Sequence, residues 1–279
     1  MLSLYLVDDL IRRSLAEDIG SGDITTLATV SPEKQIEGVL IAKESGVICG
    51  MPIAKRVFSQ IDPAINLSTF VDEGEWVEQG MIIGAIEGPA QGILTGERVA
   101  LNFLQRLSGI ATRTRSCVEA VQGTKVRITD TRKTTPGLRV VEKYAVTCGG
   151  GSNHRFNLAD GVLIKDNHIK AAGGITAAVA AARHWASHTL KIEVEVENFV
   201  MIEEALSCQA DIIMLDNMSF EDMTQAVRMI AGRALVEASG NMGEKDLAAV
   251  ARTGVDLISI GALTHTVRAM DISLRFRDR

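Results

Sequence analysis

Residues 190–217 read LKIEVEVENFVMIEEALSCQADIIMLDN, two short apolar strands on either side of a helical stretch. The same alternation runs on both sides of this segment, and six apolar runs begin at residues 126, 161, 190, 211, 234 and 255. This rhythm is typical of βα units, in which each helix returns the chain to a parallel strand. Six units predict an α/β protein with a parallel β/α barrel, and an open doubly wound sheet is the alternative.

The first hundred residues follow a different pattern. After a first helix expected from Tyr5 to Glu17, apolar and polar residues alternate between glycines over residues 38–51 and 66–94, which predicts short strands. A helix is expected over residues 97–121, with its apolar residues near helical spacing. We therefore expect an N-terminal domain at residues 1–109 and a C-terminal barrel domain at residues 110–279.

The composition excludes several classes of protein. With 279 residues, of which 46% are hydrophobic, the chain can bury a sizeable core, so disordered and fibrous proteins are excluded. No apolar run approaches the roughly 20 residues of a membrane helix, and the first residues carry acids where a signal peptide is basic. The four cysteines form no C-x-x-C pair, which favours reduced thiols in the cytoplasm. They are Cys49, Cys117, Cys148 and Cys208.

The charge is distributed unevenly along the chain. The net charge of −6 argues against general nucleic-acid binding, which needs a basic surface. Residues 125–170 nevertheless hold nine lysines and arginines against four acids, so this window is +5. A cationic patch in an acidic protein favours a pocket for a small, highly charged anion, with a solvated basic face as the alternative.

Polar residues follow each of the predicted strands. Because parallel β/α folds bind ligands at the carboxyl ends of their strands, we expect these residues to form the site. They are Asp130, Arg132, Lys133, Lys165, Asp166, His168, Glu193, Glu195, Glu197, Asp216, Ser239, Gly240, Asn241 and Gly261.

The residue types indicate the chemistry of the ligand. Arginine binds carboxylates and phosphates through two parallel hydrogen bonds, and lysine adds a point charge, so a multiply anionic ligand is expected. Glu195 and Asp216 would repel it unless a divalent cation or sugar hydroxyls lay between, which suits a phosphorylated sugar with magnesium. The glycine turns at 239–241 and 261–262 favour a backbone phosphate cradle. The cationic candidates are Arg132, Lys133, Arg155 and Lys165.

Two of these residues have alternative interpretations. Lys165 could form a Schiff base, as in aldolase-type barrels, or simply pair with Asp166. His154 could serve only as a hydrogen-bonding residue in a turn, and no second histidine lies at metal-ligand spacing from it.

Long motifs give the sequence a resemblance to a known family. They include DTRKTTPGLR at 130–139 and KYAVTCGGGSNHRFNLADGVLIKDNHI at 143–169, together with EVEVEN at 193–198 and EASGN at 237–241. With these motifs the chain resembles the quinolinate phosphoribosyltransferases over nearly its whole length. The resemblance implies an N-terminal α/β sandwich domain followed by an incomplete β/α barrel. It also implies that quinolinate and phosphoribosyl diphosphate react to nicotinate mononucleotide, diphosphate and carbon dioxide in NAD biosynthesis, with Mg²⁺.

The resemblance also implies roles for individual residues. Carboxylates of quinolinate would be bound by Arg132, His154, Arg155 and Lys165, with Lys133 near the diphosphate. Glu195 and Asp216 would face the ribose hydroxyls and magnesium, and the 5′-phosphate would lie at Ser239, Gly240, Asn241 and Gly261. Lys133, Lys165, Glu195 and Asp216 would be the catalytic group. Arg98 would reach the site of a neighbouring subunit, which makes a homodimer the expected functional unit.

Three other functions stay open at this point. A relative could use a different pyridine acid without decarboxylation, which a comparison of quinolinate with nicotinate and a measurement of carbon dioxide would decide. An aldolase built on Lys165 would be trapped by borohydride with its substrate. A phosphosugar-binding module would bind phosphoribosyl diphosphate and release no diphosphate.

Overall fold

The computed structural model describes residue 2 and residues 4–276 and divides the chain into two compact units. Unit 1 combines Met1–Arg115, Thr135–Gly150 and Thr266–Arg279, and unit 2 combines Ser116–Thr134 with Gly151–His265. Both units are thus built from separate stretches of the chain. The division expected after residue 109 stays a prediction about how the sequence is organised.

Unit 1 contains an antiparallel sheet in the order β12-β1-β5-β3. The last strand of the chain pairs with the first, so that Leu40 lies opposite Leu274, while Gly38 lies opposite Ile86 on the other side. The strands are β1 Gln35–Ala42, β3 Asn66–Thr69, β5 Ile82–Pro89 and β12 Ile272–Phe276, and a smaller pair joins β2 Gly46–Val47 to β4 Trp76–Val77. The prediction of short strands in the first hundred residues is confirmed.

The same unit contains more helix than the sequence analysis expects. The helices are η1 Leu4–Leu6, α1 Asp8–Ile19, α2 Ile24–Thr29, α3 Met51–Ile61, α4 Ala90–Ala120 and α5 Arg139–Cys148. The first helix ends two residues beyond the expected Glu17, and α4 begins seven residues before the expected Glu97. The unpredicted α3 buries one apolar face that includes Ile53, Val57 and Phe58.

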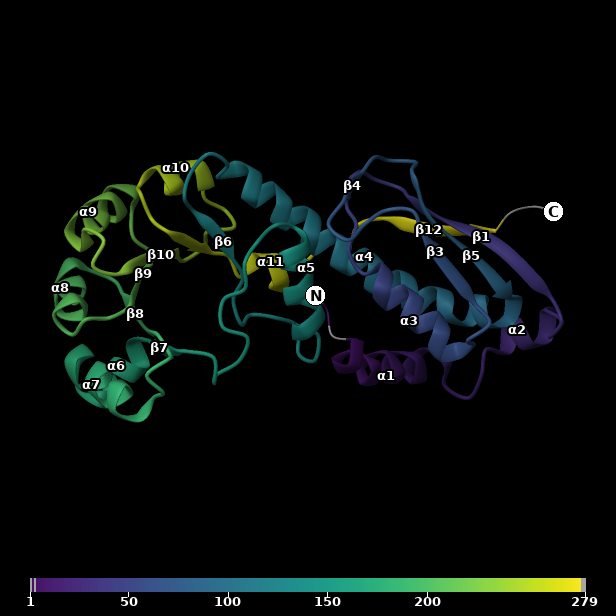
Figure 1. The fold of residues 1–279 in the computed structure, drawn as a ribbon, viewed down its shortest axis with the longest axis horizontal. Helices are drawn as coiled ribbons and strands as arrows, with labels where there is room; N and C mark the ends of the chain where they lie inside the picture. Colours follow the sequence, from purple (N-terminus) through teal and green to yellow (C-terminus); the bar gives the residue numbers. More distant parts are fainter. Residues whose placement is uncertain (1, 3, 277–279) are drawn as a thin grey trace. The chain divides into compact units, whose positions relative to one another are not determined.

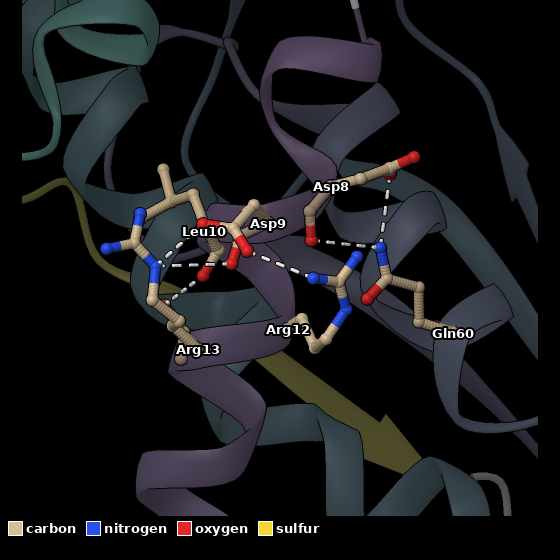
Figure 2. Close-up of polar contacts among 7 residues, drawn as sticks. Asp8, Asp9, Leu10, Arg12, Arg13 and Gln60 are labelled. Atoms are coloured by element: carbon tan, nitrogen blue, oxygen red, sulfur yellow. Dashed lines mark hydrogen bonds and ion pairs between the residues drawn. The ribbon is translucent and has the colours of Figure 1, made fainter.

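Polar contacts join α1 to α3 within unit 1 (Figure 2). Gln60 donates a hydrogen bond of 3.1 Å to the Asp8 carboxylate. Arg56 binds the same carboxylate at 2.6 and 2.8 Å. The Arg56 guanidinium holds the pKa of Asp8 below its ordinary value. On the exposed side of α1, Asp9 pairs with Arg12 and Arg13.

Helix α4 runs through residue 109 without a break, and the glycine there has a packing role. A Cβ on Gly109 would lie only 2.0 Å from the carbonyl oxygen of Arg268. The helix can therefore approach the returning C-terminal segment only because this position has no side chain.

Unit 1 also holds a buried ion pair. Glu142 is completely buried and accepts hydrogen bonds from Arg106 at 2.6 and 3.0 Å and from the Thr135 N–H at 3.0 Å. Lys143 beside it is completely buried as well. Lys143 therefore does not lie on a solvated basic face, because α5 turns this side chain into the interior.

Unit 2 consists of a six-stranded parallel sheet with helices on its outer side (Figure 1). The strands are β6 Arg127–Thr129, β7 Val162–Ile164, β8 Ile192–Val196, β9 Ile212–Asp216, β10 Leu235–Ser239 and β11 Leu257–Ser259. The helices are α6 Asp166–Ala172, α7 Ile175–Trp185, α8 Phe199–Ser207, α9 Phe220–Ile230, α10 Leu247–Arg252 and α11 Ala262–His265. All six predicted strands are confirmed.

The strand order is that of an incomplete barrel. It reads β6-β11-β10-β9-β8-β7, so the first strand pairs with the last, and no ladder joins β6 to β7 in the described residues. A doubly wound sheet would instead reverse its winding part-way across. The predicted barrel is thus confirmed and the doubly wound alternative is wrong.

A side-chain cap marks the start of α9. The Ser219 hydroxyl accepts a hydrogen bond of 3.0 Å from the Asp222 N–H, which caps the first turn. The helix ends at Ile230, and Ala231 directly after it has the left-handed conformation. The four cysteines are free thiols, and among the described residues no helix is long and apolar enough to cross a membrane.

Candidate active site

The carboxyl ends of the parallel strands bring several predicted site residues to one edge of unit 2. Glu195 lies near the end of β8, Asp216 ends β9 and Ser239 ends β10. Asp216 and Ser239 are direct neighbours in the parallel register, and Gly261 follows β11. Neighbouring parallel strands that end together create the edge at which such folds bind ligands.

Lys165 lies at this edge and pairs with Glu195. Its Nζ donates a short hydrogen bond to Glu195 Oε2, and both side chains are partly buried. The Lys165 N–H donates to His168 Nδ1 at 3.0 Å, which fixes the lysine at the start of α6. The alternative partner Asp166 instead contacts Lys170 at 3.4 Å. The Lys165–Glu195 pair therefore places one cation and one anion side by side at the edge formed by the carboxyl ends of the strands.

The turn after β10 has left-handed backbone at Gly240 and Asn241. Gly240 has φ of +91°, and a Cβ there would lie 2.2 Å from Asn217 Oδ1. Asn217 is itself left-handed, donates its N–H to the Ser239 carbonyl at 3.1 Å and its side-chain amide to Asp216 at 2.9 Å. Gly240 therefore leaves room for Asn217, which orients Asp216. Sequence analysis had not assigned Asn217 a role.

A second glycine brings the Lys133 segment close to the last strand of the barrel. A Cβ on Gly261 would lie 3.1 Å from Lys133 Cδ, and the Thr264 hydroxyl donates a hydrogen bond of 2.9 Å to the Lys133 carbonyl. Lys133 is exposed, so its ammonium group is available to an anion. Thr264, which sequence analysis did not single out, thus fixes the backbone of a predicted site residue.

His154 and Arg155 lie on the segment that follows α5 and runs along β6. The His154 N–H donates to Asp130 Oδ1 at 2.9 Å, and its Nε2 lies 3.1 Å from Glu193 Oε2 and 3.6 Å from Glu237 Oε2. Arg155 donates to the Gly161 carbonyl at 3.2 Å. Burial lowers the pKa of Arg155, and the nearby Arg132 guanidinium lowers it further. Arg132 and Arg155 therefore form one dense positive region.

Of the three glutamates near β8, two point inward. Glu193 is 4% exposed and Glu195 is partly buried, whereas Glu197 is exposed. Glu237, on β10, is only 1% exposed and was missed by sequence analysis, because an acid within an apolar strand gives no local sign of its partner.

Two groups of described residues have the atom types of metal ligands within 4.8 Å of one another. They are Cys49, Glu73 and Cys148 in unit 1, and His154, Glu193 and Glu237 in unit 2. In the first group, Glu73 already accepts hydrogen bonds from the N–H groups of Gly50 and Met51. The second group lies beside the positive region of Arg132 and Arg155, which opposes a divalent cation.

Arg98 belongs to unit 1, where it lies exposed on α4. Burial raises the pKa of the neighbouring Glu97, and Arg98 opposes that shift. The other predicted site residues belong to unit 2, so the role of Arg98 stays a prediction.

Comparison with known families assigns most of the chain to one family. A model described as "Quinolinate phosphoribosyl transferase, C-terminal domain" matches residues 110–275, and the corresponding N-terminal domain model matches residues 23–108. The chain belongs to the quinolinate phosphoribosyltransferase family. The resemblance drawn from the motifs is thus confirmed, and the protein is a phosphoribosyltransferase.

Individual members of the quinolinate phosphoribosyltransferase family agree over almost the full length. A Bacillus subtilis protein named "Probable nicotinate-nucleotide pyrophosphorylase [carboxylating]" is 43% identical over 95% of this chain and 91% of its own. A Synechocystis protein of the same name is 44% identical over 97% and 92%. The solved nicotinate-nucleotide pyrophosphorylase of Francisella tularensis has a TM-score of 0.95 at 41% identity, covering 99% of this chain and 98% of that chain.

Proposed function

We propose that the chain transfers the phosphoribosyl group of phosphoribosyl diphosphate to quinolinate in NAD biosynthesis, giving nicotinate mononucleotide, diphosphate and carbon dioxide. Family membership over both domains supports this reaction. The observation that carries it is the edge of unit 2, where Lys165 pairs with Glu195 and Asp216 ends the neighbouring strand. A pyridine dicarboxylate needs the cations, and an activated pentose needs the acids. We place the reaction in the cytoplasm.

In this proposal quinolinate binds at the positive region of Arg132 and Arg155. Two guanidinium groups and the Lys165 ammonium suit two adjacent carboxylates, because guanidinium binds a carboxylate through two parallel hydrogen bonds. The His154 ring is turned toward buried acids, so it contributes by holding the adjacent Arg155 in place. In this proposal Arg132, Arg155 and Lys165 contact quinolinate, and His154 supports Arg155.

In this proposal the phosphoribosyl group binds at the carboxyl ends of the neighbouring strands. The 5′-phosphate fits the glycine turns at Ser239, Gly240, Asn241 and Gly261, where backbone N–H groups can approach closely. Glu195 and Asp216 face the ribose hydroxyls, and Lys133 lies near the diphosphate.

The pair of Glu195 and Asp216 also suits Mg²⁺, which prefers carboxylate and phosphate oxygens. We propose that the ion is held mainly by the substrate beside these two residues, without direct protein ligands. When bound, Mg²⁺ neutralises part of the charge of the diphosphate.

The residues of this site fit a substitution without a covalent enzyme intermediate. The pyridine nitrogen forms a bond to the anomeric carbon while the bond to diphosphate breaks, so positive charge grows on the sugar and negative charge on the leaving group. Lys133 and Arg155 stabilise the negative charge, and Glu195 with Asp216 lies beside the positive charge. The new bond makes the ring nitrogen cationic, which stabilises the electron pair left on the adjacent carbon when its carboxylate departs as carbon dioxide. A proton from solvent then forms the C–H bond at that carbon.

We propose further that a homodimer is the functional unit and that Arg98 acts in the neighbouring subunit's site. Mixing Arg98→Ala with Lys165→Ala protein then restores activity, because a hybrid dimer contains one site without either change. Lack of recovery after verified subunit exchange would assign Arg98 to its own chain.

The decisive assay measures diphosphate release with quinolinate and phosphoribosyl diphosphate. We expect release that depends on quinolinate and one carbon dioxide for each diphosphate. Release with nicotinate and no carbon dioxide would instead identify an enzyme for another pyridine acid.

A further inference from the structure

Two acidic side chains are buried together inside unit 2. Glu193 on β8 is 4% exposed and Glu237 on β10 is 1% exposed, and each has a carboxylate oxygen close to the same atom, His154 Nε2, at 3.1 and 3.6 Å. Two ionised carboxylates in one buried site repel each other strongly, so the cluster requires a compensating positive charge or a proton.

The hydrogen bonds of His154 indicate that its ring is neutral. The Arg155 N–H donates a hydrogen bond of 2.8 Å to His154 Nδ1, so that nitrogen is an acceptor and carries no proton. The single ring proton is then on Nε2, which faces Glu193. The histidine thus supplies one hydrogen bond to the two acids and no full charge.

The remaining charges distinguish the two acids. The charged or titratable groups that face Glu237 are Glu193 from β8 and His154 from the segment along β6. Glu193 also interacts with the Arg155 guanidinium. Burial raises the pKa of Glu237 to about 7, and the neighbouring Glu193 carboxylate adds to this shift, while His154 and the Ser259 hydroxyl oppose it. Glu237 is therefore the acid of this pair that takes the proton.

We propose that Glu237 is a positioning residue that carries a proton shared with Glu193, and that this acid pair holds His154 in the Nε2–H form beneath the quinolinate site. The inference rests on the proposed function, since it concerns how the site is held in shape. His154 is also tied to Asp130 through its N–H, and Ser152 pairs with Thr129 on β6. Fixing the ring therefore fixes the backbone that presents Arg155.

The first test reads the protons directly and needs no turnover. In protein labelled with ¹⁵N-histidine, we expect the His154 signals at pH 6 to show an unprotonated Nδ1 and a protonated Nε2, with His154→Gln providing the assignment. Infrared difference spectra should show a protonated carboxylic acid that is lost as the pH rises through about 7 and that is absent from Glu237→Gln. A His154 imidazolium at pH 6, or no such carboxylic acid in the wild type, would overturn the proposal.

The second test compares two matched amide variants by kinetics. Glutamine resembles a protonated glutamate, so Glu237→Gln should keep kcat/KM for quinolinate within about threefold of the wild type at pH 6. Between pH 6 and pH 8 the wild type should fall by up to about tenfold relative to this variant, because it loses the Glu237 proton. Glu193→Gln removes the carboxylate that faces His154 and should raise the KM for quinolinate at least about tenfold at every pH.

Several outcomes would contradict the shared proton. Equal losses in both variants at every pH would mean that an ionised Glu237 is needed. One equivalent of a divalent metal in the purified protein, lost in either variant, would mean that the three residues bind a metal instead. A wild type without quinolinate-dependent diphosphate release would remove the proposed function, while the histidine and infrared spectra would still decide where the proton lies. These wild-type spectra also decide the case if a variant fails to fold.

Discussion

Two fully buried glutamates, one in each unit, have opposite surroundings. In unit 1, Glu142 accepts two hydrogen bonds from Arg106 and one from the Thr135 backbone. In unit 2, Glu237 faces Glu193 and has the His154 ring nitrogen at 3.6 Å. A buried charge is tolerated where donors satisfy it, and a buried acid without such donors holds a proton instead. The ion pair of Glu142 therefore stabilises the fold, whereas the protonation of Glu237 serves the candidate site.

The largest expected effect comes from removing the hydrogen-bond partner of Glu142. Arg106→Leu leaves the Glu142 charge buried without its main partner, so we expect the free energy of unfolding to fall by about 3 to 5 kcal/mol. Chemical denaturation measures this change. Arg12→Leu is the control, because the Arg12–Asp9 pair is exposed and should contribute little. Equal, small effects in both variants would mean that burial does not set the strength of these pairs.

The next effect concerns the cations of unit 2. Lys165→Ala should lose about 3 kcal/mol of transition-state stabilisation, roughly a hundredfold or more in kcat/KM, with an unchanged circular dichroism spectrum. Arg132→Ala should lose at least as much. Lys170→Ala is the matched control, since Lys170 is exposed and pairs with Asp166 on the surface. Near-normal turnover of Lys165→Ala would contradict the site assignment.

A smaller effect is expected in the pH dependence of the free energy of unfolding. The pKa of Glu237 is raised from 4.5 to about 7 on folding, so its contribution to stability is fully present below pH 4.5 and is lost as the pH rises through 7. Glu237→Gln has no such proton to lose. Between pH 5 and pH 8 its free energy of unfolding should therefore gain roughly 2 kcal/mol relative to the wild type. Denaturation curves at the two pH values test this, with exposed Glu244→Gln as the control, and a difference independent of pH would refute it.

The smallest effect returns to unit 1. Glu73 accepts hydrogen bonds from Gly50 and Met51 at the start of α3 and from the Tyr144 hydroxyl at 2.8 Å. Burial raises the pKa of Tyr144, which keeps its hydroxyl a donor. Glu73→Gln loses the charge at this helix start, and we expect about 1 to 2 kcal/mol less stability by denaturation. Glu78→Gln, on an exposed acid, should change stability much less, and equal losses would assign no special role to Glu73.

The success of the sequence analysis depended on how local each signal was. The strands of unit 2 were predictable because each is a short apolar run between well-marked turns. The start of α9 is set just as locally, since the Ser219 side chain caps it. Helix α3 was missed because it begins at a glycine and takes its cap from Glu73, more than twenty residues away. The pairing of β12 with β1 was missed for the same reason, since it joins opposite ends of the chain.

The candidate site divides in the same way. Its arginines, lysines and glycine turns lie directly after predicted strands, so the residue types alone indicated an anionic sugar phosphate. The Lys165–Glu195 pair, the close approach of Gly240 to Asn217 and the close approach of Gly261 to Lys133 each join different βα units, and no spacing within one unit could indicate them.

By itself, the sequence determined the βα rhythm, the family and the chemical types at the strand ends, because these depend on short-range periodicity and on motifs that are continuous in the chain. Only the tertiary structure decided which buried acid is satisfied and which is not. That property depends on how many donors the fold brings within hydrogen-bond distance of each carboxylate, and those donors come from residues far apart in the chain.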